Sequence, residues 1–423
     1  MKKIVLFLAQ ALCLITIAHA EDHDMPGMSM PSSVNVADPM NREGSGTSWA
    51  PDSSPIYAKM FMQGRDMLML HGAIFPRYVN ASSRRGDDRI DAPNWLMGMY
   101  AHPLGDSAQL GLRGMFSADL LTEQGRGYPL LFQSGETWHG QPLHDRQHPH
   151  DLVSELSVTY SQKIADEFSA YLYLGYPGEP ALGPPAFMHR VSAMDDPDAP
   201  ISHHWADSTH ITFGVVTLGA QWRDVKIEGS AFKGREPDEL RYNFDAPKLD
   251  SFSARLSWNP AKNLALQVSH GYIRSPEAIE PDANRHRTTA SAIYNLPLGR
   301  DSNWATSFVW GSNTETHEGM TQSWLLETNY QRGADTVYAR WERVEKSGHE
   351  LVLNGADEEK IFPVSAYSLG YVHDLAHGKG LDIGLGGQFT LDPKPGGLDR
   401  YYGEGTPYSF QVFFRVRPSL MGN

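Results

Sequence analysis

Residues 380–391 read GLDIGLGGQFTL, and this stretch shows most clearly the pattern that decides the fold. Leu385 and Phe389 fall on one side of an extended chain, whereas Asp382 and Gln388 fall on the other. A period of two is typical of a β-strand with one apolar and one polar face. This stretch is therefore predicted to be a strand that separates two different environments.

Segments with the same alternation follow one another along the chain. The sixteen segments are 67–79, 92–103, 107–119, 152–162, 167–175, 208–222, 225–234, 249–258, 263–274, 286–298, 302–313, 322–331, 335–346, 363–375, 380–391 and 406–417. Short turns alternate with longer loops, which lie at 80–91, 120–151, 176–207, 235–248, 275–285, 314–321, 347–362 and 392–405. Short periplasmic turns and long external loops are typical of a bacterial outer-membrane barrel. We therefore predict an all-β fold, a single antiparallel transmembrane β-barrel of about 16 strands that occupies residues 67–423.

The apolar face of these strands must point toward lipid, because the lumen inside sixteen strands is too wide for side chains to fill. A charged side chain on the lipid face near the membrane midplane would cost on the order of 2–4 kcal/mol. The polar residues therefore point inward, where they would line water or form ion pairs across the lumen. The predicted pore-lining set is Arg113, Glu155, Lys226, Glu228, Arg255, Glu327, Arg340, Glu342, Asp382 and Arg415.

The start of the chain, residues 1–20, has the features of a secretory signal peptide. Lys2 and Lys3 precede an apolar run, and 18–20 (Ala-His-Ala) is a small-x-small cleavage site. The only cysteine, Cys13, would leave with this peptide, which excludes disulfides, a thiol nucleophile and thiolate ligands. The formal net charge of −14 argues against a nucleic-acid partner. Export and the barrel pattern together predict the outer membrane of a Gram-negative bacterium, with its lipid as a partner.

Residues 21–66 form the next predicted unit, a Met- and His-containing periplasmic segment that we expect to be disordered. Its ligand-type side chains are His23, Met25, Met28 and Met30. Thioethers are soft ligands that suit Cu(I), and imidazole binds copper in either oxidation state. The segment is interpreted either as a copper-capturing tail or as a plain flexible tail.

Histidines are concentrated in two of the long loops. Eight of the chain's 18 histidines fall between His139 and His210, and three of them occur in 144–151, which reads HDRQHPHD. The two loops flank one predicted hairpin, so they leave the same end of the barrel and can meet. Nitrogen and carboxylate ligands suit Cu(II), Zn(II) or Ni(II). The candidate ligands are His144, His148, His150, Asp151, His189, His203, His204 and His210; the alternative is a packed constriction without a metal.

Two serines lie close to histidines in the sequence, as a hydrolase would require. Ser154 follows His150 by four positions, and Ser208 precedes His210 by two. Neither serine belongs to a G-x-S-x-G nucleophile elbow. We therefore expect the protein not to be an enzyme, and keep an outer-membrane lipid-modifying hydrolase as the third functional class.

Several of these features together resemble the outer-membrane β-barrel proteins associated with copper-resistance systems of Gram-negative bacteria. The likeness rests on the signal peptide, the Asp/His/Met tail, the sixteen-strand alternation and the 144–151 motif, and extends to 187–190, 202–210 and 234–239. It covers most of the chain as architecture and only short runs as motif. The resemblance implies a role in copper tolerance or copper passage.

We therefore expect an outer-membrane channel or metal-handling barrel linked to copper homeostasis or resistance. The alternative is a general or small-organic-solute porin whose histidine loops narrow the pore. Copper ions or small solutes would be the ligands, with copper as the one candidate cofactor. A homotrimer is compatible with the strand number, by analogy with general porins.

Overall fold

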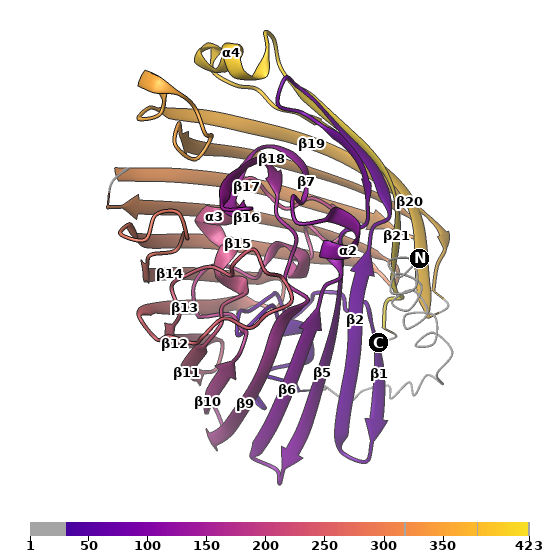
Figure 1. Cartoon of the computed structure of the whole chain (residues 1–423). Helices are drawn as coiled ribbons and strands as arrows, with labels where there is room; N and C mark the ends of the chain where they lie inside the picture. Colours follow the sequence, from indigo (N-terminus) through magenta and orange to yellow (C-terminus); the bar gives the residue numbers. More distant parts are fainter. Residues whose placement is uncertain (1–30, 317–318, 379, 422–423) are drawn as a thin grey trace.

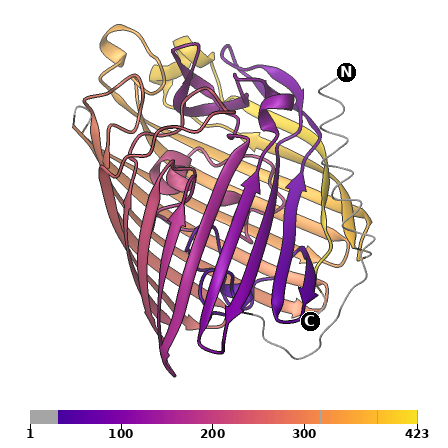
Figure 2. The ribbon, with the colours of Figure 1, turned by 60° about the horizontal axis from the view of Figure 1, so that its bottom comes forward.

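The computed structural model describes residues 31–316, 319–378 and 380–421. They form a closed barrel of antiparallel strands (Figure 1). Short turns gather at one end of this barrel and the long loops at the other end (Figure 2). The predicted signal peptide and the tail ligands His23, Met25, Met28 and Met30 lie outside the described residues.

The wall consists of strand segments that are hydrogen-bonded in one continuous sheet. Their bounds are β1 (Ala58–Gln63), β2 (Asp66–Ile74), β3 (Arg77–Ser82), β4 (Asp88–Asp91), β5 (Asn94–Leu104), β6 (Ala108–Phe116), β9 (Val153–Ala165), β10 (Phe168–Gly175), β11 (Val215–Trp222), β12 (Val225–Phe232), β13 (Ser251–Ala261), β14 (Leu264–Arg274), β15 (Asn284–Gly299), β16 (Ser302–Glu315), β17 (Gly319–Arg332), β18 (Asp335–Ser347), β19 (Ile361–Ala376), β20 (Leu381–Leu391) and β21 (Tyr408–Pro418).

Short helices and one further hairpin occupy the connections and the N-terminal part. The hairpin is β7 (Tyr128–Trp138) with β8 (Gln141–Gln147), and the helices are η1 (Met40–Arg42), α2 (Asp119–Glu123), η2 (Phe187–His189), α3 (His203–Ala206), η3 (Ser208–His210), η4 (Gly355–Asp357), η5 (Gly396–Leu398) and α4 (Asp399–Tyr402). Among the described residues, no helix has both the length and the apolar character that a membrane crossing demands.

Nineteen strand segments make sixteen barrel strands, because two strands are interrupted and one segment is additional. β2 and β3 are halves of the first strand, interrupted at Pro76, and β4 and β5 are halves of the second, interrupted at Pro93. Proline lacks the N–H group that a β-ladder requires. β1 is the additional segment and pairs with β2. β21 pairs with β3 and meets β2 at Ile74, which closes the barrel and confirms the predicted fold class.

The two faces of the wall differ as the period of two predicts. In β20, Leu385 and Phe389 are 41% and 47% exposed, whereas Asp382 and Gln388 are 0% and 6% exposed. Trp258 in β13 is likewise 49% exposed. An apolar outer face of this extent is unfavourable in water and suited to lipid.

Three connections differ from the prediction. The strand predicted to start at 208 begins only at Val215, because 208–214 belongs to a loop that folds inward. The long loop predicted at 314–321 is a short reversal, since Glu315 pairs with Gly319. The loop predicted at 120–151 contains the β7–β8 hairpin.

Residues 31–57 lie inside the barrel near the short-turn end (Figure 2), and we call them the N-terminal plug. Asp38 accepts hydrogen bonds from Trp49 Nε1 and from Gln221 Nε2 of β11, at 3.0 and 2.7 Å. The predicted disorder of 21–66 is therefore wrong for residues 31–66. The polar side chains that suggested a solvated tail are instead satisfied by partners on the inner wall.

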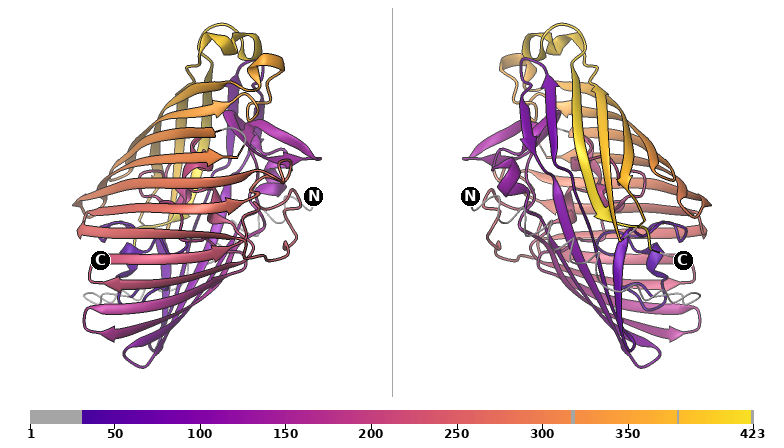
Figure 3. Two further views of the ribbon diagram at one scale, coloured as in Figure 1. Left: turned by 90° about the vertical axis from the view of Figure 1, so that its left-hand side faces the viewer. Right: turned by 90° about the vertical axis from the view of Figure 1, so that its right-hand side faces the viewer.

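The loop between β10 and β11, residues 176–214, also folds into the lumen, where Figures 1 and 3 show α3 surrounded by the wall. We call it the inner loop. From Pro177 to Gly214 every residue is buried except Met188, His189 and Met194, which are half-buried. The inner loop and the N-terminal plug touch, since Ala186 N donates to Ser45 Oγ at 2.7 Å.

Candidate metal site in the barrel lumen

The ten charged residues predicted to line the pore lie on the inner face of the wall. Each of them is at most 5% exposed. They meet oppositely charged groups rather than open water: Arg255 Nε lies 3.0 Å from Glu228 Oε2, and Arg113 Nη2 lies 2.7 Å from Glu155 Oε1. Of the two arrangements that the sequence left open, a water-lined pore and ion pairing, the structure has ion pairing.

Ion pairs also fix the inner loop to the wall. Arg190 of the inner loop places Nε 2.6 Å from Glu327 Oε1 of β17 and Nη1 2.7 Å from Asp207 Oδ2. Glu327 in turn accepts a hydrogen bond from Arg340 Nε of β18 at 3.2 Å. Glu342 accepts the backbone N–H of Ser202 at 2.9 Å. Breaking one partner of such a buried network leaves an uncompensated charge, so the loop is held firmly on this side.

Five of the predicted ligands come together where the inner loop meets the loop that carries β7 and β8. We call them the lumen histidines: His148, His150, His203, His204 and His210. Their ring centroids form a chain of contacts, 6.2 Å for His148–His204, 5.5 Å for His203–His204, 5.1 Å for His203–His210 and 5.5 Å for His150–His210. The expectation that the two loops meet therefore describes this part of the structure correctly.

Carboxylates orient three of these rings through the Nδ1 atom. His150 Nδ1 lies 2.6 Å from Asp119 Oδ2, and His203 Nδ1 lies 2.8 Å from Asp207 Oδ1. His148 Nδ1 lies 3.3 Å from a carboxylate oxygen of Glu136. A carboxylate on one ring nitrogen is the usual support for a histidine that binds a metal through the other nitrogen.

Several of the other ring nitrogens make no hydrogen bond. Nε2 of His150, of His204 and of His210 is buried without a hydrogen-bond partner among the described residues, whereas His204 Nδ1 lies 3.6 Å from Glu236 Oε1. A buried polar atom without a partner costs about 1–3 kcal/mol. Three buried nitrogens without a protein partner, on rings that belong to one chain of contacts, therefore favour a bound ligand.

Burial favours the neutral form of His148, His204 and His210. It lowers the pKa of His148 well below its usual 6.5 and the pKa of His210 to about 3. The pKa of His204 is also lowered, by burial first, although Glu236 opposes the shift. A neutral imidazole carries the lone pair that a metal ion needs.

Close packing fixes the position of His204. Gly135 in β7 has φ +107°, and a Cβ atom there would lie 2.3 Å from Cε1 of the His204 ring. Only glycine tolerates both this backbone conformation and this approach. The β7–β8 hairpin therefore forms one wall of the histidine cluster.

The other predicted ligands do not join the lumen histidines. His144 is directed to Asp145, with Nδ1 2.8 Å from Oδ2, and its side chain is 34% exposed. Asp151 pairs with Arg241 at 3.4 Å. His189 lies next to His71 and Trp95, with ring centroids 5.6 and 4.8 Å away. Of the eight candidate ligands, these three therefore lie apart from the cluster, and metal binding by any of the eight stays a prediction.

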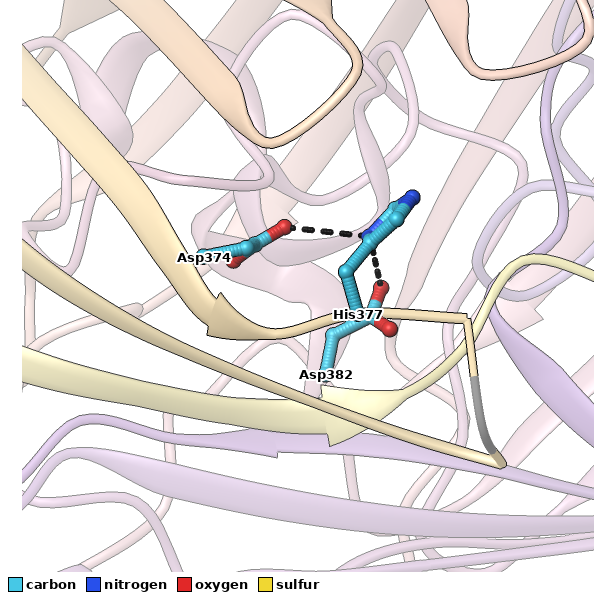
Figure 4. A group of neighbouring side chains, drawn as sticks. All are labelled: Asp374, His377 and Asp382. Atoms are coloured by element: carbon cyan, nitrogen blue, oxygen red, sulfur yellow. Dashed lines mark ion pairs between the residues drawn. The ribbon is translucent and has the colours of Figure 1, made fainter.

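A preformed coordination set is found at a different place. Among the described residues, only Asp374, His377 and Asp382 bring a ligand atom each within 4.8 Å of one another. Figure 4 shows His377 directed between the two carboxylates, with Nδ1 3.3 Å from Asp374 Oδ2 and 3.5 Å from Asp382 Oδ2. Arg415 also contacts Asp374. This group lies where β19 ends and β20 begins, apart from the lumen histidines.

The two candidate nucleophiles are used differently. Ser154 Oγ donates to Asp151 O at 3.2 Å, and Ser208 Oγ donates to Glu236 Oε1 at 3.2 Å. Within the described ranges, no hydrogen bond joins either hydroxyl to a histidine ring. The arrangement lacks the serine–histidine contact on which nucleophilic catalysis depends.

The sequence interpretation missed part of the site. Glu136, Asp119 and Glu236 orient the lumen histidines, yet they lie far from them in the chain. A second group, Met69, His71, Met97 and Met99, lines the lumen beside them. The alternation of 67–71 (MLMLH) and 97–99 (MGM) was the available signal, since in a strand it places every Met and His on one face.

No family model matches the sequence, and no curated protein is significantly similar to it. Solved structures do match. OmpF of Salmonella typhi in complex with daunomycin is 10% identical, over 85% of this chain and 99% of that chain, with a TM-score of 0.53. The chain has the fold of an outer-membrane β-barrel.

Two further matches are more distant. The anion-selective porin from Comamonas acidovorans is 12% identical over 83% of this chain and 99% of that chain, with a TM-score of 0.48. OmpT, an outer membrane protein of Vibrio cholerae, is 8% identical over 85% and 100%, also with a TM-score of 0.48. At these identities the similarity shows the fold alone.

Proposed function

We propose that this protein is an outer-membrane channel whose closed lumen handles copper ions as cargo, in the service of copper homeostasis or resistance. The observation that carries the proposal is the convergence of five imidazoles from two loops inside the barrel, with carboxylates behind the rings and ring nitrogens left without partners. Imidazole nitrogens bind Cu(II) strongly, and copper forms the most stable complexes among the divalent first-row metals.

The inner loop would couple copper binding to opening of the channel. The inner loop supplies His203, His204 and His210, and it is the same segment that fills the lumen. A metal that binds these rings also binds the loop that would have to move for passage. The inner loop would therefore both bind the metal and open the lumen. A metal that binds one position of the loop more tightly than the other would shift the balance between the two positions.

In the orientation proposed for the barrel, the sites would lie along one route. Short turns face the periplasm in outer-membrane barrels, so the N-terminal plug and the predicted tail would lie on the periplasmic side. The tail would capture copper through His23, Met25, Met28 and Met30, and the lumen histidines would receive it. No catalytic step belongs to this proposal. A homotrimer stays a prediction by analogy.

Metal binding by the purified barrel tests the proposal. We expect His148→Ala/His150→Ala to lower the affinity for Cu(II) by about tenfold to a hundredfold, because ligands and their neighbours have effects of this size. The matched control is His102→Ala/His373→Ala, which removes two half-exposed histidines that each pair with one aspartate. Equal affinity in the wild type and in the first variant would contradict the proposal.

A general or small-organic-solute porin is the second candidate function, and it is favoured by the barrel fold together with the packed lumen. In this reading the lumen histidines only narrow the pore. Single-channel conductance in a planar bilayer separates the two candidates. A constitutively open current that copper leaves unchanged favours the solute porin, whereas a current that changes with copper favours the metal-handling channel.

A further inference from the structure

A cavity of about 150 Å³ lies inside the barrel, between the first strands of the wall and the inner loop. Its lining includes six thioethers together with several imidazoles. The six methionines that line it are Met40, Met69, Met97, Met99, Met188 and Met194. His71, His150 and His189 also line it. We call it the methionine cavity.

Strand register brings these side chains together. Met69 of β2 faces Met99 of β5, and His71 of β2 faces Met97 of β5. Each pair projects from the inner face: Met69 is 4% exposed, whereas the preceding Leu68 is 38% exposed on the outer face. Directly opposed residues on one face of a sheet have Cβ atoms about 4.5–5.5 Å apart. The wall therefore presents three thioethers and one imidazole as a contiguous surface.

The inner loop completes the cavity with the only three residues that it leaves half-buried between Pro177 and Gly214. These residues are Met188, His189 and Met194. All other residues of that range are fully buried against the wall or against one another. The loop is therefore packed everywhere except where it presents two thioethers and an imidazole to the methionine side of the lumen.

The imidazole of His71 has a ring nitrogen without a protein partner. Nε2 of His71 is buried and makes no hydrogen bond among the described residues. His71 instead packs edge-on against Trp95, at 5.0 Å, and against His189, at 5.6 Å. An unsatisfied nitrogen in apolar surroundings is costly, about 1–3 kcal/mol, unless something binds it.

Methionine can also serve simply as a flexible filler of irregular cores. A filler, however, closes gaps, whereas these six side chains surround an open volume. A purely apolar ligand would not satisfy the nitrogen of His71 either. The combination of thioethers with a free imidazole matches the ligand preference of Cu(I).

We propose that the methionine cavity is a Cu(I) site, with thioethers of Met69, Met97 and Met99 and the imidazoles of His71 and His189 as its ligands. This inference deepens the proposed copper function and rests on it for its physiological meaning. His150 lines the cavity and also contacts His210 in the histidine cluster, at 5.5 Å between ring centroids. The soft site and the histidine site therefore adjoin through one residue.

Anaerobic Cu(I) titration against a chromogenic chelator tests the proposal on the full mature chain. Met25, Met28 and Met30 are replaced by leucine in every sample, so that the tail adds no thioethers. We expect Met97→Leu/Met99→Leu to weaken Cu(I) binding by about tenfold or more. The sulfur neighbours of the ion in its X-ray absorption spectrum should decrease in the same variant.

The matched control is Met67→Leu/Met115→Leu. These two methionines belong to the same buried cluster but do not line the cavity. Their replacement should leave Cu(I) affinity unchanged. Equal losses in both double variants, or no loss in either, would overturn the proposal. Resistance of the barrel to unfolding in detergent on a gel shows that each variant is folded.

The two proposals can fail separately. The variant His203→Ala/His204→Ala removes lumen histidines that do not line the methionine cavity. Loss of Cu(II) binding there, with normal Cu(I) binding in Met97→Leu/Met99→Leu, rejects the methionine site alone. Loss of Cu(I) binding in the methionine variant, with normal Cu(II) binding in the histidine variants, rejects the histidine site alone.

Discussion

The lumen has two sides that hold the inner loop in different ways. On the ion-pair side, Glu327 of the wall pairs both with Arg190 of the loop and with Arg340 of the wall. On the methionine side, Met97 and His71 of the wall face a cavity. Two neighbouring residues of the inner loop contact opposite sides. Arg190 binds Glu327 on the ion-pair side, and His189 packs against His71 and Trp95 on the methionine side.

This difference suggests a division of labour. A buried ion pair requires a defined geometry and matches each charge with its partner, so it fixes a segment in place. Methionine side chains are flexible. Their thioethers, like neutral imidazoles, have lone pairs that can bind a ligand. The ion-pair side therefore determines where the inner loop sits, and the methionine side can respond to a ligand.

The largest expected effect comes from removing a charge on the ion-pair side. Glu327→Gln leaves the guanidinium groups of Arg190 and Arg340 without their shared carboxylate, which costs on the order of 3–5 kcal/mol. Hydrogen exchange of the inner loop should accelerate, and channel conductance should rise. Glu167→Gln is the control, because Glu167 pairs with Arg223 at the exposed surface, where ion pairs contribute little to stability. A loop equally protected in both variants would remove the distinction between the two sides.

An intermediate effect is expected from pH at the histidine cluster. The pKa of His210 falls from 6.5 to about 3 through burial, so between these values the opened loop takes up a proton that the closed loop does not. Lowering the pH from 7 to 5 should therefore favour opening, by on the order of 2 kcal/mol for this one residue. Hydrogen exchange of the inner loop, compared between wild type and His210→Gln, measures the contribution.

The comparison with His210→Gln is needed because Glu136 has the opposite effect on how the stability of the closed loop depends on pH. Burial raises its pKa to about 8, so the closed form gains stability as the pH falls from 8 toward 4.5. The difference between the wild type and the variant cancels this contribution. If both proteins show the same pH dependence, His210 is not a buried neutral base in solution.

The smallest effect concerns the methionine side. Met97→Leu/Met99→Leu exchanges side chains of similar volume and should change the free energy of unfolding by less than about 1.5 kcal/mol per site. Urea unfolding followed by tryptophan fluorescence measures it. A loss as large as that of Glu327→Gln would show that these methionines serve mainly as core packing.

The barrel wall was predictable because the alternation of apolar and polar residues is a local pattern. In 380–391 each residue's face follows from its neighbours two positions away, and the strand bounds from 251 onward differ from the prediction mostly by one to three residues at either end. The prediction failed at 208–214, where Thr209 and Ile211 continue the alternation. There the chain turns inward as η3, and His210 Nδ1 bonds to the carbonyl oxygen of Asp207 at 2.9 Å.

The sequence by itself determined a barrel wall with an apolar outside and a charged inside, because side-chain alternation and loop length act within a few residues. What fills that barrel was decided only by tertiary structure. Arg190 and Glu327 are 137 residues apart, and His150 and Asp119 are 31 apart, so no short pattern joins them. Whether an inward histidine meets a carboxylate, another histidine or a thioether depends on how the folded loops and the plug divide the lumen.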